Sequence, residues 1–595
     1  MDLHLSRPCT HRSDHGHQSY GRSDQRHIKP EVAQMTALLQ VDNLRTYFET
    51  DSGTVKSVDG ISFEVGKGEI LGLVGESGSG KSITGFSLIG LIDKPGKIQS
   101  GSSIRLEGRE LVGLPESQLR NIRGREISMV FQDPMMTLNP VLKVIDQIAM
   151  AIRAHEKVSH AEVRRRAIEA LARVRIVEPE KKVDQYPHQF SGGMRQRVAI
   201  AIALLHKPKL VIADEPTTAL DVSVQAEILK EVKALVSELG ISMIWISHDL
   251  ATVASISKKI AVMRLGKIVE TGSVADVLGS PKHPYTQGLL DSLPSRKKPG
   301  ELLTSSATEK SGQFSITEAR KNRPAGSNPD FVAANDVTMI FQKPVGSLGR
   351  FAKRLGLAKP SHAVHAVQSA TLTIARGEVL GLVGESGSGK STLGRIICGI
   401  STPTSGSVLV DGRKVREDDR KIGTSVQMIF QDPFASLDPR RTIFQSVAEG
   451  PIAHGLCTKK NARAYVERWL KAVAFDPVLA DRYPHQFSGG QRQRIAIARA
   501  LAMQPEFIVC DEPVASLDVS IQAQVINLLL QLKRSLDLTL LFISHDLSVV
   551  RHLCDHVVVM HHGKIVERGT VSEVFAQPKQ PYTQMLLNAV PKLTC

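Results

Sequence analysis

GESGSGKS spans residues 75–82 and occurs again, letter for letter, at residues 384–391. Each copy follows a short apolar run, ILGLV at 70–74 and VLGLV at 379–383, and each leads into a segment with helix-like periodicity. The order strand, glycine-rich loop and helix, with the spacing G-x-x-x-x-G-K-[ST], is that of a phosphate-binding loop. Two identical octapeptides in this context argue against a purely structural turn.

The residue types in each loop suit a bound phosphate chain. Glycines let backbone N–H groups turn inward around phosphates, a lysine can reach the β- and γ-phosphates, and the serine after it can ligate Mg²⁺. The predicted nucleotide-binding residues are Gly75, Gly78, Gly80, Lys81 and Ser82 in the first copy, and Gly384, Gly387, Gly389, Lys390 and Ser391 in the second.

An acidic pair ends a later apolar run in each half, Asp214-Glu215 in the first and Asp511-Glu512 in the second. Nucleotide sites form at the carboxyl ends of parallel strands, so we expect each aspartate to hold Mg²⁺ together with the loop serine, Ser82 or Ser391. Each glutamate is placed to polarise an attacking water. A helix N-cap role is the alternative for these carboxylates.

Two more polar residues recur after apolar runs at matching places. His248 and His545 stand in Ser-His-Asp triplets, and we expect them to contact the γ-phosphate and sense its loss. Gln132 and Gln431 stand in FQDP stretches and can reach Mg²⁺ or the attacking water. We predict that these four side chains act with the two glutamates in catalysis, although a lone histidine in such a place is usually structural.

A serine and two glycines open a helical pattern in each half. A helix N-terminus that carries glycines is an anion site, and a simple N-cap is the alternative. The residues are Ser191, Gly192 and Gly193 in the first half, and Ser488, Gly489 and Gly490 in the second.

The whole succession of motifs returns once, so the chain of 595 residues is a tandem duplication of one domain. Strands that alternate with helices around a phosphate loop predict an α/β core with a largely parallel sheet. We predict a disordered tail at residues 1–36, domains at 37–290 and 332–595, and a flexible linker rich in Pro, Gly and Ser at 291–331.

Composition limits the classes of function. The net charge of +15 is compatible with binding to nucleic acid, with binding to an anionic membrane surface, or with a solvated basic surface. Aromatic residues make up 4% of the chain, so base-stacking platforms for single-stranded nucleic acid are not an obvious feature. The six cysteines form no C-x-x-C pair, which suits a reducing compartment and suggests no zinc site. No apolar run is long enough to span a bilayer.

The order of phosphate loop, glutamine loop, SGG signature, acidic pair, D-loop and histidine resembles that of the ATP-binding cassette (ABC) ATPases, over nearly all of the chain beyond residue 37. The D-loops read Ala219-Leu220-Asp221 and Ser516-Leu517-Asp518. The signatures read FSGGMRQR and FSGGQRQR, with phenylalanine where leucine is commonest. The resemblance implies ATP and Mg²⁺ as cofactors. It also implies two tandem P-loop NTPase domains, each with a RecA-like α/β core, an antiparallel β subdomain and a helical subdomain.

Finer motifs are similar to the peptide/nickel branch of bacterial ABC importers. Both halves carry YPHQFSGG, and Pro-Tyr-Thr stands near each end, at 284–286 and 581–583. The resemblance implies two permease subunits, an extracytoplasmic solute-binding protein, no nucleic acid, and a peripheral position on the cytoplasmic face of the inner membrane. Dipeptides, oligopeptides, glutathione, opines and nickel complexes all remain open as solutes.

The resemblance also implies that the two halves pair head to tail, with each ATP between the phosphate loop of one half and the SGG of the other. Both sets of residues are intact, so two hydrolytic sites are expected. The aromatic residues that would stack on adenine map to Phe48, or Tyr47, and to Phe341.

Two other classes of ABC protein are alternatives. Soluble tandem-cassette ATPases act on ribosomes or DNA, but the linker here is broken by Pro, Gly and Ser rather than a long charged helical arm, and zinc C-x-x-C pairs are missing. A fused exporter ATPase that lacks its membrane half is less compatible with the YPHQFSGG and Pro-Tyr-Thr motifs.

Overall fold

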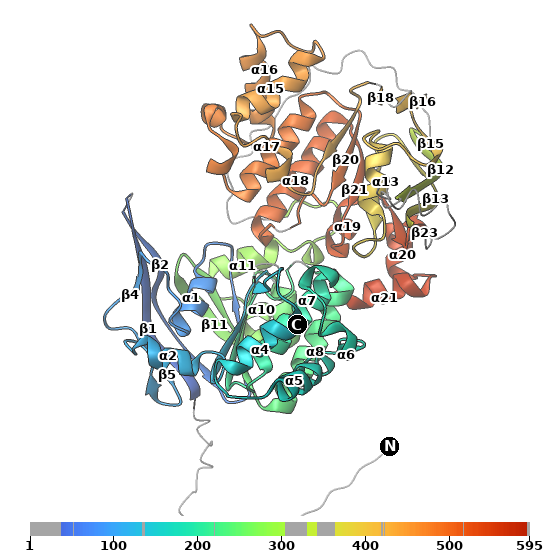
Figure 1. Cartoon of the computed structure of the whole chain (residues 1–595). Helices are drawn as coiled ribbons and strands as arrows, with labels where there is room; N and C mark the ends of the chain where they lie inside the picture. Colours follow the sequence, from blue (N-terminus) through green and yellow to red (C-terminus); the bar gives the residue numbers. More distant parts are fainter. Residues whose placement is uncertain are drawn as a thin grey trace, which may run out of the picture. The chain divides into compact units, whose positions relative to one another are not determined.

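The computed structural model describes residues 37–591, apart from 52, 134–136, 219, 304–329, 342–362, 418–419, 422 and 516. The predicted tail at 1–36 and most of the predicted linker therefore lie outside the described residues. Two units with a similar order of elements follow one another along the chain (Figure 1). They are called cassette 1, residues 37–296, and cassette 2, residues 330–591.

Cassette 1 is built on a six-stranded sheet in which the strand before the phosphate loop, β3, has parallel neighbours on both sides. The strand order is β11-β10-β3-β9-β8-β7, and the β10–β11 pair is antiparallel. The strands are β3 (Ile70–Val74), β7 (Ile127–Val130), β8 (Leu210–Asp214), β9 (Ser242–Ser247), β10 (Lys259–Arg264) and β11 (Lys267–Ser273).

Cassette 2 repeats this sheet, with the strand before its phosphate loop, β14, in the corresponding place. The order is β23-β22-β14-β21-β20-β19, again with one antiparallel pair, β22–β23. The strands are β14 (Val379–Val383), β19 (Val426–Ile429), β20 (Phe507–Asp511), β21 (Thr539–Ile543), β22 (His556–His561) and β23 (Lys564–Thr570).

The central strands are buried on both faces, which is why their sequences are continuous apolar runs. Along β9, Met243 and Trp245 pack into the core that contains most of the helices, whereas Ile244 and Ile246 pack into the core shared with the antiparallel sheet. The predicted α/β core with a largely parallel sheet is confirmed.

An antiparallel sheet covers part of each cassette and accounts for the alternating sequence before each phosphate loop. In cassette 1 it has the order β2-β1-β5-β6, with β4 paired to β1, and in cassette 2 the order β13-β12-β15-β16. Its strands are β1 (Ala37–Thr50), β2 (Gly53–Gly66), β4 (Gly96–Ile98), β5 (Ser103–Leu106), β6 (Arg109–Glu110), β12 (Val332–Phe341), β13 (Val364–Ile374), β15 (Ser405–Val410) and β16 (Arg413–Lys414). A further pair joins β17 (Arg416–Glu417) to β18 (Arg420–Lys421).

The helices of cassette 1 follow the strands in the order expected for such a core, with a helical region between β7 and α7. They are α1 (Lys81–Leu88), α2 (Glu116–Ile122), α4 (Val144–Arg153), α5 (His160–Arg173), α6 (Pro179–Lys182), η1 (Pro187–Gln189), α7 (Gly192–Leu204), α8 (Val222–Leu239), α9 (Leu250–Ile256), α10 (Val274–Gly279), α11 (Pro284–Asp291) and η2 (Pro294–Arg296).

Cassette 2 has the matching helical region between β19 and α17. Its helices are α13 (Lys390–Ile397), α14 (Pro433–Ser436), α15 (Ile443–Ala453), α16 (Ala462–Ala472), η3 (Pro477–Asp481), η4 (Pro484–Gln486), α17 (Gly489–Leu501), α18 (Val519–Leu536), α19 (Leu547–Leu553), α20 (Val571–Ala576) and α21 (Pro581–Ala589).

Residues 297–303, called the strap here, follow η2 and bind to α18 and α19 of cassette 2. Gly300 N donates to His552 O at 2.8 Å. The backbone of Leu303 exchanges two hydrogen bonds with the Asn527 side chain, at 2.8 and 2.7 Å, and its own side chain is 3% exposed in the cassette 2 core. The strap lies within the stretch 291–331 for which the sequence predicts a flexible linker, after the end of α11 and η2, which also fall in that stretch.

Candidate nucleotide sites

Each phosphate loop joins the strand before it to the first helix of its cassette through a backbone path that requires glycine. Gly80 has φ +100°, and a β carbon added there would lie 2.2 Å from Ser57 O. The corresponding distance for Gly389, to Ala366 O, is 2.1 Å. The loop therefore packs too tightly against the antiparallel sheet to accept any other residue at this position.

The loop lysines lie at the centre of their loops. Lys81 Nζ donates to the carbonyl oxygens of Gly75 and Glu76, both at 2.8 Å, and Lys390 makes the same two contacts at 2.8 Å. Burial lowers the pKa of both ammonium groups, although nearby carboxylates oppose the shift. Each lysine ammonium thus bonds to the backbone of its own loop, next to the place where a bound phosphate chain would lie.

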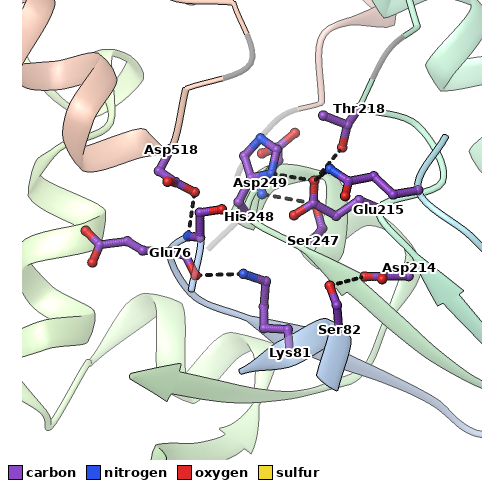
Figure 2. A network of polar contacts seen from close by, with 12 residues as sticks. Glu76, Lys81, Ser82, Asp214, Glu215, Thr218, Ser247, His248, Asp249 and Asp518 are labelled. Carbon is purple, nitrogen blue, oxygen red and sulfur yellow. Dashed lines mark hydrogen bonds and ion pairs between the residues drawn. The ribbon is translucent and has the colours of Figure 1, made fainter. Parts of the chain in front are cut away.

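The loop serines meet the aspartates that end β8 and β20, and Figure 2 shows the pair of cassette 1. Ser82 Oγ donates to Asp214 Oδ1 at 3.0 Å, and Ser391 Oγ donates to Asp511 Oδ1 at 2.8 Å. Burial raises the pKa of Asp214 to about 6 and also raises that of Asp511. Each cassette thus brings together two of the oxygen ligands predicted for Mg²⁺.

Three side chains converge on one carboxylate oxygen in cassette 1, as Figure 2 shows in part. Glu215 Oε2 accepts from Gln132 Nε2 at 3.0 Å and from Thr218 Oγ1 at 3.1 Å, and lies 3.2 Å from His248 Nδ1. The Glu215 backbone has φ +44°, a left-handed conformation that is costly for a glutamate. The predicted base, glutamine and histidine are therefore brought together, and the structure adds Thr218.

The glutamate and the histidine favour each other's charged form. Burial acts to lower the pKa of His248. The hydrogen bond to Glu215 and the charge of that carboxylate outweigh burial, so the pKa of His248 is raised. Burial likewise acts to raise the pKa of Glu215, yet His248 and Lys81 bring it below its usual value. An ionised Glu215 is the form that can accept a proton.

Cassette 2 has a similar cluster with one donor fewer. Glu512 Oε2 accepts from Gln431 Nε2 at 2.8 Å and lies 3.3 Å from His545 Nδ1. Ala515 stands where cassette 1 has Thr218, so the hydroxyl is missing. The pKa shifts have the same directions, because burial is again outweighed by the attraction between the two charges.

Each phosphate loop is also contacted by an aspartate of the other cassette. Asp518 Oδ1, at the start of α18, accepts from Ser77 N at 2.7 Å, and Asp221 Oδ1, at the start of α8, accepts from Ser386 N at 2.7 Å (Figure 2 shows the first). The two contacts are reciprocal.

The signature residues open α7 and α17. Ser191 and Ser488 are N-caps whose hydroxyls accept from backbone N–H groups at 3.3 and 3.4 Å. Gly193 packs under α8, where an added β carbon would lie 2.4 Å from Val224 Cγ1, and Gly490 packs in the same way. Gly192 and Gly489 have room for a β carbon. In the part of the chain that the structure describes, no hydrogen bond joins a signature to the other cassette's phosphate loop, so this pairing stays a prediction.

The aromatic residues proposed to stack on adenine lie on the antiparallel sheets. The Phe48 ring of β1 covers Gly96 of β4, where an added β carbon would lie 2.5 Å from the ring. Tyr47 Oη donates to Asp59 Oδ1 at 2.5 Å. Phe341 ends β12 and is 48% exposed. Stacking on adenine remains a prediction for these side chains.

Sequence reasoning did not assign Tyr285 and Tyr582 to the site, although the structure brings both to the phosphate loops. Their hydroxyls accept hydrogen bonds from Glu76 N at 3.2 Å and from Glu385 N at 3.0 Å. The repeated Pro-Tyr-Thr motif was the available signal.

Among the described residues, no helix has both the length and the apolar character needed to cross a membrane.

Comparison with known proteins extends over most of the chain. The family model described as "ABC transporter" matches residues 58–218 and 367–515, and the model "Oligopeptide/dipeptide transporter, C-terminal region" matches 269–319 and 566–594. The glutathione import ATP-binding protein GsiA of Pectobacterium atrosepticum is 42% identical over 568 residues, which cover 93% of this chain and 89% of that protein.

GsiA of Escherichia coli K12 is 43% identical over 564 residues, with coverage of 93% and 89%. Among solved structures, CbiO1 of Clostridium perfringens, part of the ABC transporter complex CbiONQ, is 29% identical over 42% of this chain and 92% of that one, with a TM-score of 0.35. The chain belongs to the ABC transporter family, as an ATP-binding and ATP-hydrolysing protein with two cassettes in one polypeptide and the C-terminal region of oligopeptide/dipeptide transporters in each half.

Proposed function

We propose that the chain powers an importer of peptides or related small solutes, such as dipeptides, oligopeptides or glutathione. The observation that carries the proposal is the presence of a complete phosphate loop, Ser–Asp pair and Glu–His–Gln cluster in both cassettes. The relatives named for glutathione import and the repeated C-terminal region support a peptide-like solute. Both sites are therefore expected to hydrolyse ATP.

The residues in each loop fit ATP and Mg²⁺. The tight glycine backbone and the buried lysine suit a phosphate chain, and Ser82 Oγ and Asp214 Oδ1, 3.0 Å apart, are hard oxygen donors of the kind that Mg²⁺ prefers. Bound Mg²⁺ would neutralise charge on the phosphates. The same assignment applies to Ser391 and Asp511.

Glu215 and Glu512 would act as general bases. Each is held ionised and oriented by a histidine and a glutamine, so each can accept a proton from the water that attacks the γ-phosphate. His248 and His545 would respond to the loss of that phosphate. Gln132 and Gln431 would pass the state of the site to the segments that follow them, where permease helices would dock.

The assembly that we propose has two permease subunits in the inner membrane, an extracytoplasmic solute-binding protein and this chain on the cytoplasmic face. ATP would lie between each phosphate loop and the opposite signature. The reciprocal contacts of Asp518 and Asp221 support this head-to-tail arrangement. Nucleic acid is not among the partners.

The test combines complex isolation with uptake. The tagged chain, purified from detergent-solubilised membranes, should bring along two multi-spanning permeases. A strain without the chain should lose uptake of labelled glutathione or oligopeptides, and the wild-type chain, but not Glu215→Gln/Glu512→Gln, should restore it. Co-purification of ribosomal or DNA-repair proteins, with normal uptake in the deletion strain, would refute import while leaving the ATPase chemistry intact.

A further inference from the structure

The Pro-Tyr-Thr motif near the end of each cassette has no part in the chemistry described so far. Pro284 is the first residue of α11, so Tyr285 and Thr286 lie in the first turn of this helix. Pro581 and Tyr582 begin α21 in the same way. Both copies lie inside the matched C-terminal region of oligopeptide/dipeptide transporters.

A glutamate on the preceding strand holds each motif against its own cassette. Glu270 of β11 accepts from Lys282 N at 2.8 Å and from His283 N at 3.1 Å, and His283 Nδ1 accepts from Tyr285 N at 3.1 Å. Glu567 of β23 accepts the two corresponding backbone bonds in cassette 2, at 2.7 and 3.1 Å. The start of each helix is thereby fixed to the sheet that carries the phosphate loop.

The tyrosine rings are held by a cationic or aromatic neighbour at the end of the adjacent strand. The Arg264 guanidinium lies 4.9 Å from the centroid of the Tyr285 ring, and the His561 ring stacks on Tyr582 with centroids 3.8 Å apart. Burial raises the pKa of Tyr582 to about 12 and raises that of Tyr285 as well. Each hydroxyl is therefore protonated at neutral pH and held in place.

Each hydroxyl reaches the second residue of its own phosphate loop. Tyr285 Oη accepts from Glu76 N at 3.2 Å, while Glu76 O accepts from Lys81 Nζ at 2.8 Å. The next amide, Ser77 N, donates to Asp518 of the other cassette at 2.7 Å. Figure 2 shows Glu76 between Lys81 and Asp518. Hydrogen bonds thus hold consecutive backbone groups at the start of the loop.

We propose that Tyr285 and Tyr582 are positioning residues that preset the phosphate loop of their own cassette for ATP. The inference rests on the ATP sites described under Proposed function. Without the hydroxyl, the amide of the second loop residue loses its partner, and the first peptide groups must be ordered when the nucleotide binds. That cost appears as weaker binding, because a ligand gains affinity from a site that is already in its bound geometry.

The experiment measures binding of the nonhydrolysable ATP analogue AMP-PNP, with Mg²⁺, to the purified full chain by calorimetry. In a Lys390→Ala background, where the cassette 1 loop is the remaining site, Tyr285→Phe should raise Kd about fivefold, within the range for one hydrogen bond. In a Lys81→Ala background, Tyr582→Phe should do the same. The matched control is Tyr465→Phe, which removes a tyrosine bond to a backbone oxygen, Ala502 O at 2.6 Å, remote from both loops.

Two results would overturn the inference. One is a Kd for Tyr285→Phe equal to that of Tyr465→Phe in the Lys390→Ala background. The other is a rise in that background that is as large for Tyr582→Phe as for Tyr285→Phe, since this would indicate general destabilisation. If the wild-type chain bound no nucleotide, the proposed sites would fail as well. If it bound nucleotide and the tyrosine variants matched the control, the positioning role alone would fail.

Discussion

The two cassettes carry identical phosphate loops but surround the neighbouring glutamate differently. Within the described residues, Glu215 has three side-chain partners and Glu512 has two, because Ala515 replaces Thr218. The groups that would face phosphates and Mg²⁺ are the same in both halves, whereas one residue that donates to the carboxylate varies. Both sites therefore hold the same predicted groups, but the proposed general bases have different numbers of side-chain partners.

The strap makes a second distinction between the cassettes. It binds Asn527 and His552 of cassette 2, and the corresponding residues of cassette 1 are Lys230 and Ser255. The residues that bind the strap are therefore present in cassette 2 and are replaced in cassette 1. The two cassettes resemble each other at their nucleotide sites and differ at the residues that bind the strap.

The largest expected effect comes from replacing the two glutamates that we propose as general bases. Glu215→Gln or Glu512→Gln should each lower steady-state ATP turnover to half or less, and the double variant should lower it by about 10²–10⁴-fold, since loss of a general base has effects of this size. Turnover is measured by phosphate release from the purified chain. If the two single variants fall unequally, the difference in hydrogen bonding has made the sites unequal.

The control for these variants is Glu238→Gln, which removes an exposed carboxylate of α8. Full wild-type turnover in either of the two single-site variants would contradict the prediction of two hydrolytic sites.

The next largest effect should come from the strap. Leu303→Ala should destabilise cassette 2 by about 2–4 kcal/mol, because it leaves a cavity in a core where the leucine is 3% exposed. The neighbouring Leu302 is 49% exposed, so Leu302→Ala is the matched control and should have little effect. Thermal unfolding followed by calorimetry would show an earlier transition in the first variant. Equal transitions in the two variants would mean that the strap does not stabilise cassette 2.

The phosphate loops, acidic pairs, glutamines and histidines could be predicted because each is a short contiguous motif whose strand or helix context is visible in the sequence. The contacts that join motifs could not. Tyr285 meets Glu76 across 209 residues, and Asp518 meets Ser77 across 441. Such pairs depend on how the C-terminal helix and the second cassette pack, and hydrophobic periodicity carries no information on that packing.

The ordered structure of the strap could not be predicted for a different reason. Its polar residues, glycine and proline are those of a linker, and one buried side chain, Leu303, is too weak a pattern to indicate an ordered segment. Its hydrogen bonds go to side chains and backbone of another domain.

A smaller effect concerns the histidines. Glu215→Gln removes the hydrogen-bonded charge that contributes most to raising the pKa of His248, and burial is then opposed by the weaker attraction of Asp249 and Asp518, so that pKa should fall. His545 should respond in the same way to Glu512→Gln. Histidine-selective NMR titration, with the signal assigned from His248→Gln, measures the shift. A His248 pKa that stayed raised in Glu215→Gln would show that another group holds its proton.

The smallest effect tests the single hydroxyl that separates the two clusters. The hydrogen bond from Thr218 helps to lower the pKa of Glu215. Thr218→Ala should therefore raise that pKa, and the acidic limb of the pH profile of turnover should move to higher pH. In a Glu512→Gln background, where site 1 carries the turnover, rates on that limb should fall about threefold with the plateau unchanged, as expected for one hydrogen bond.

Ala515→Thr in a Glu215→Gln background should move the acidic limb to lower pH. Thr217→Val, which installs the residue that cassette 2 has at the adjacent buried position, should leave it in place. If neither substitution, at residue 218 or at residue 515, shifted the acidic limb, the group that titrates on that limb would not be the glutamate. The two cassettes would then differ in hydrogen bonding without differing in chemistry.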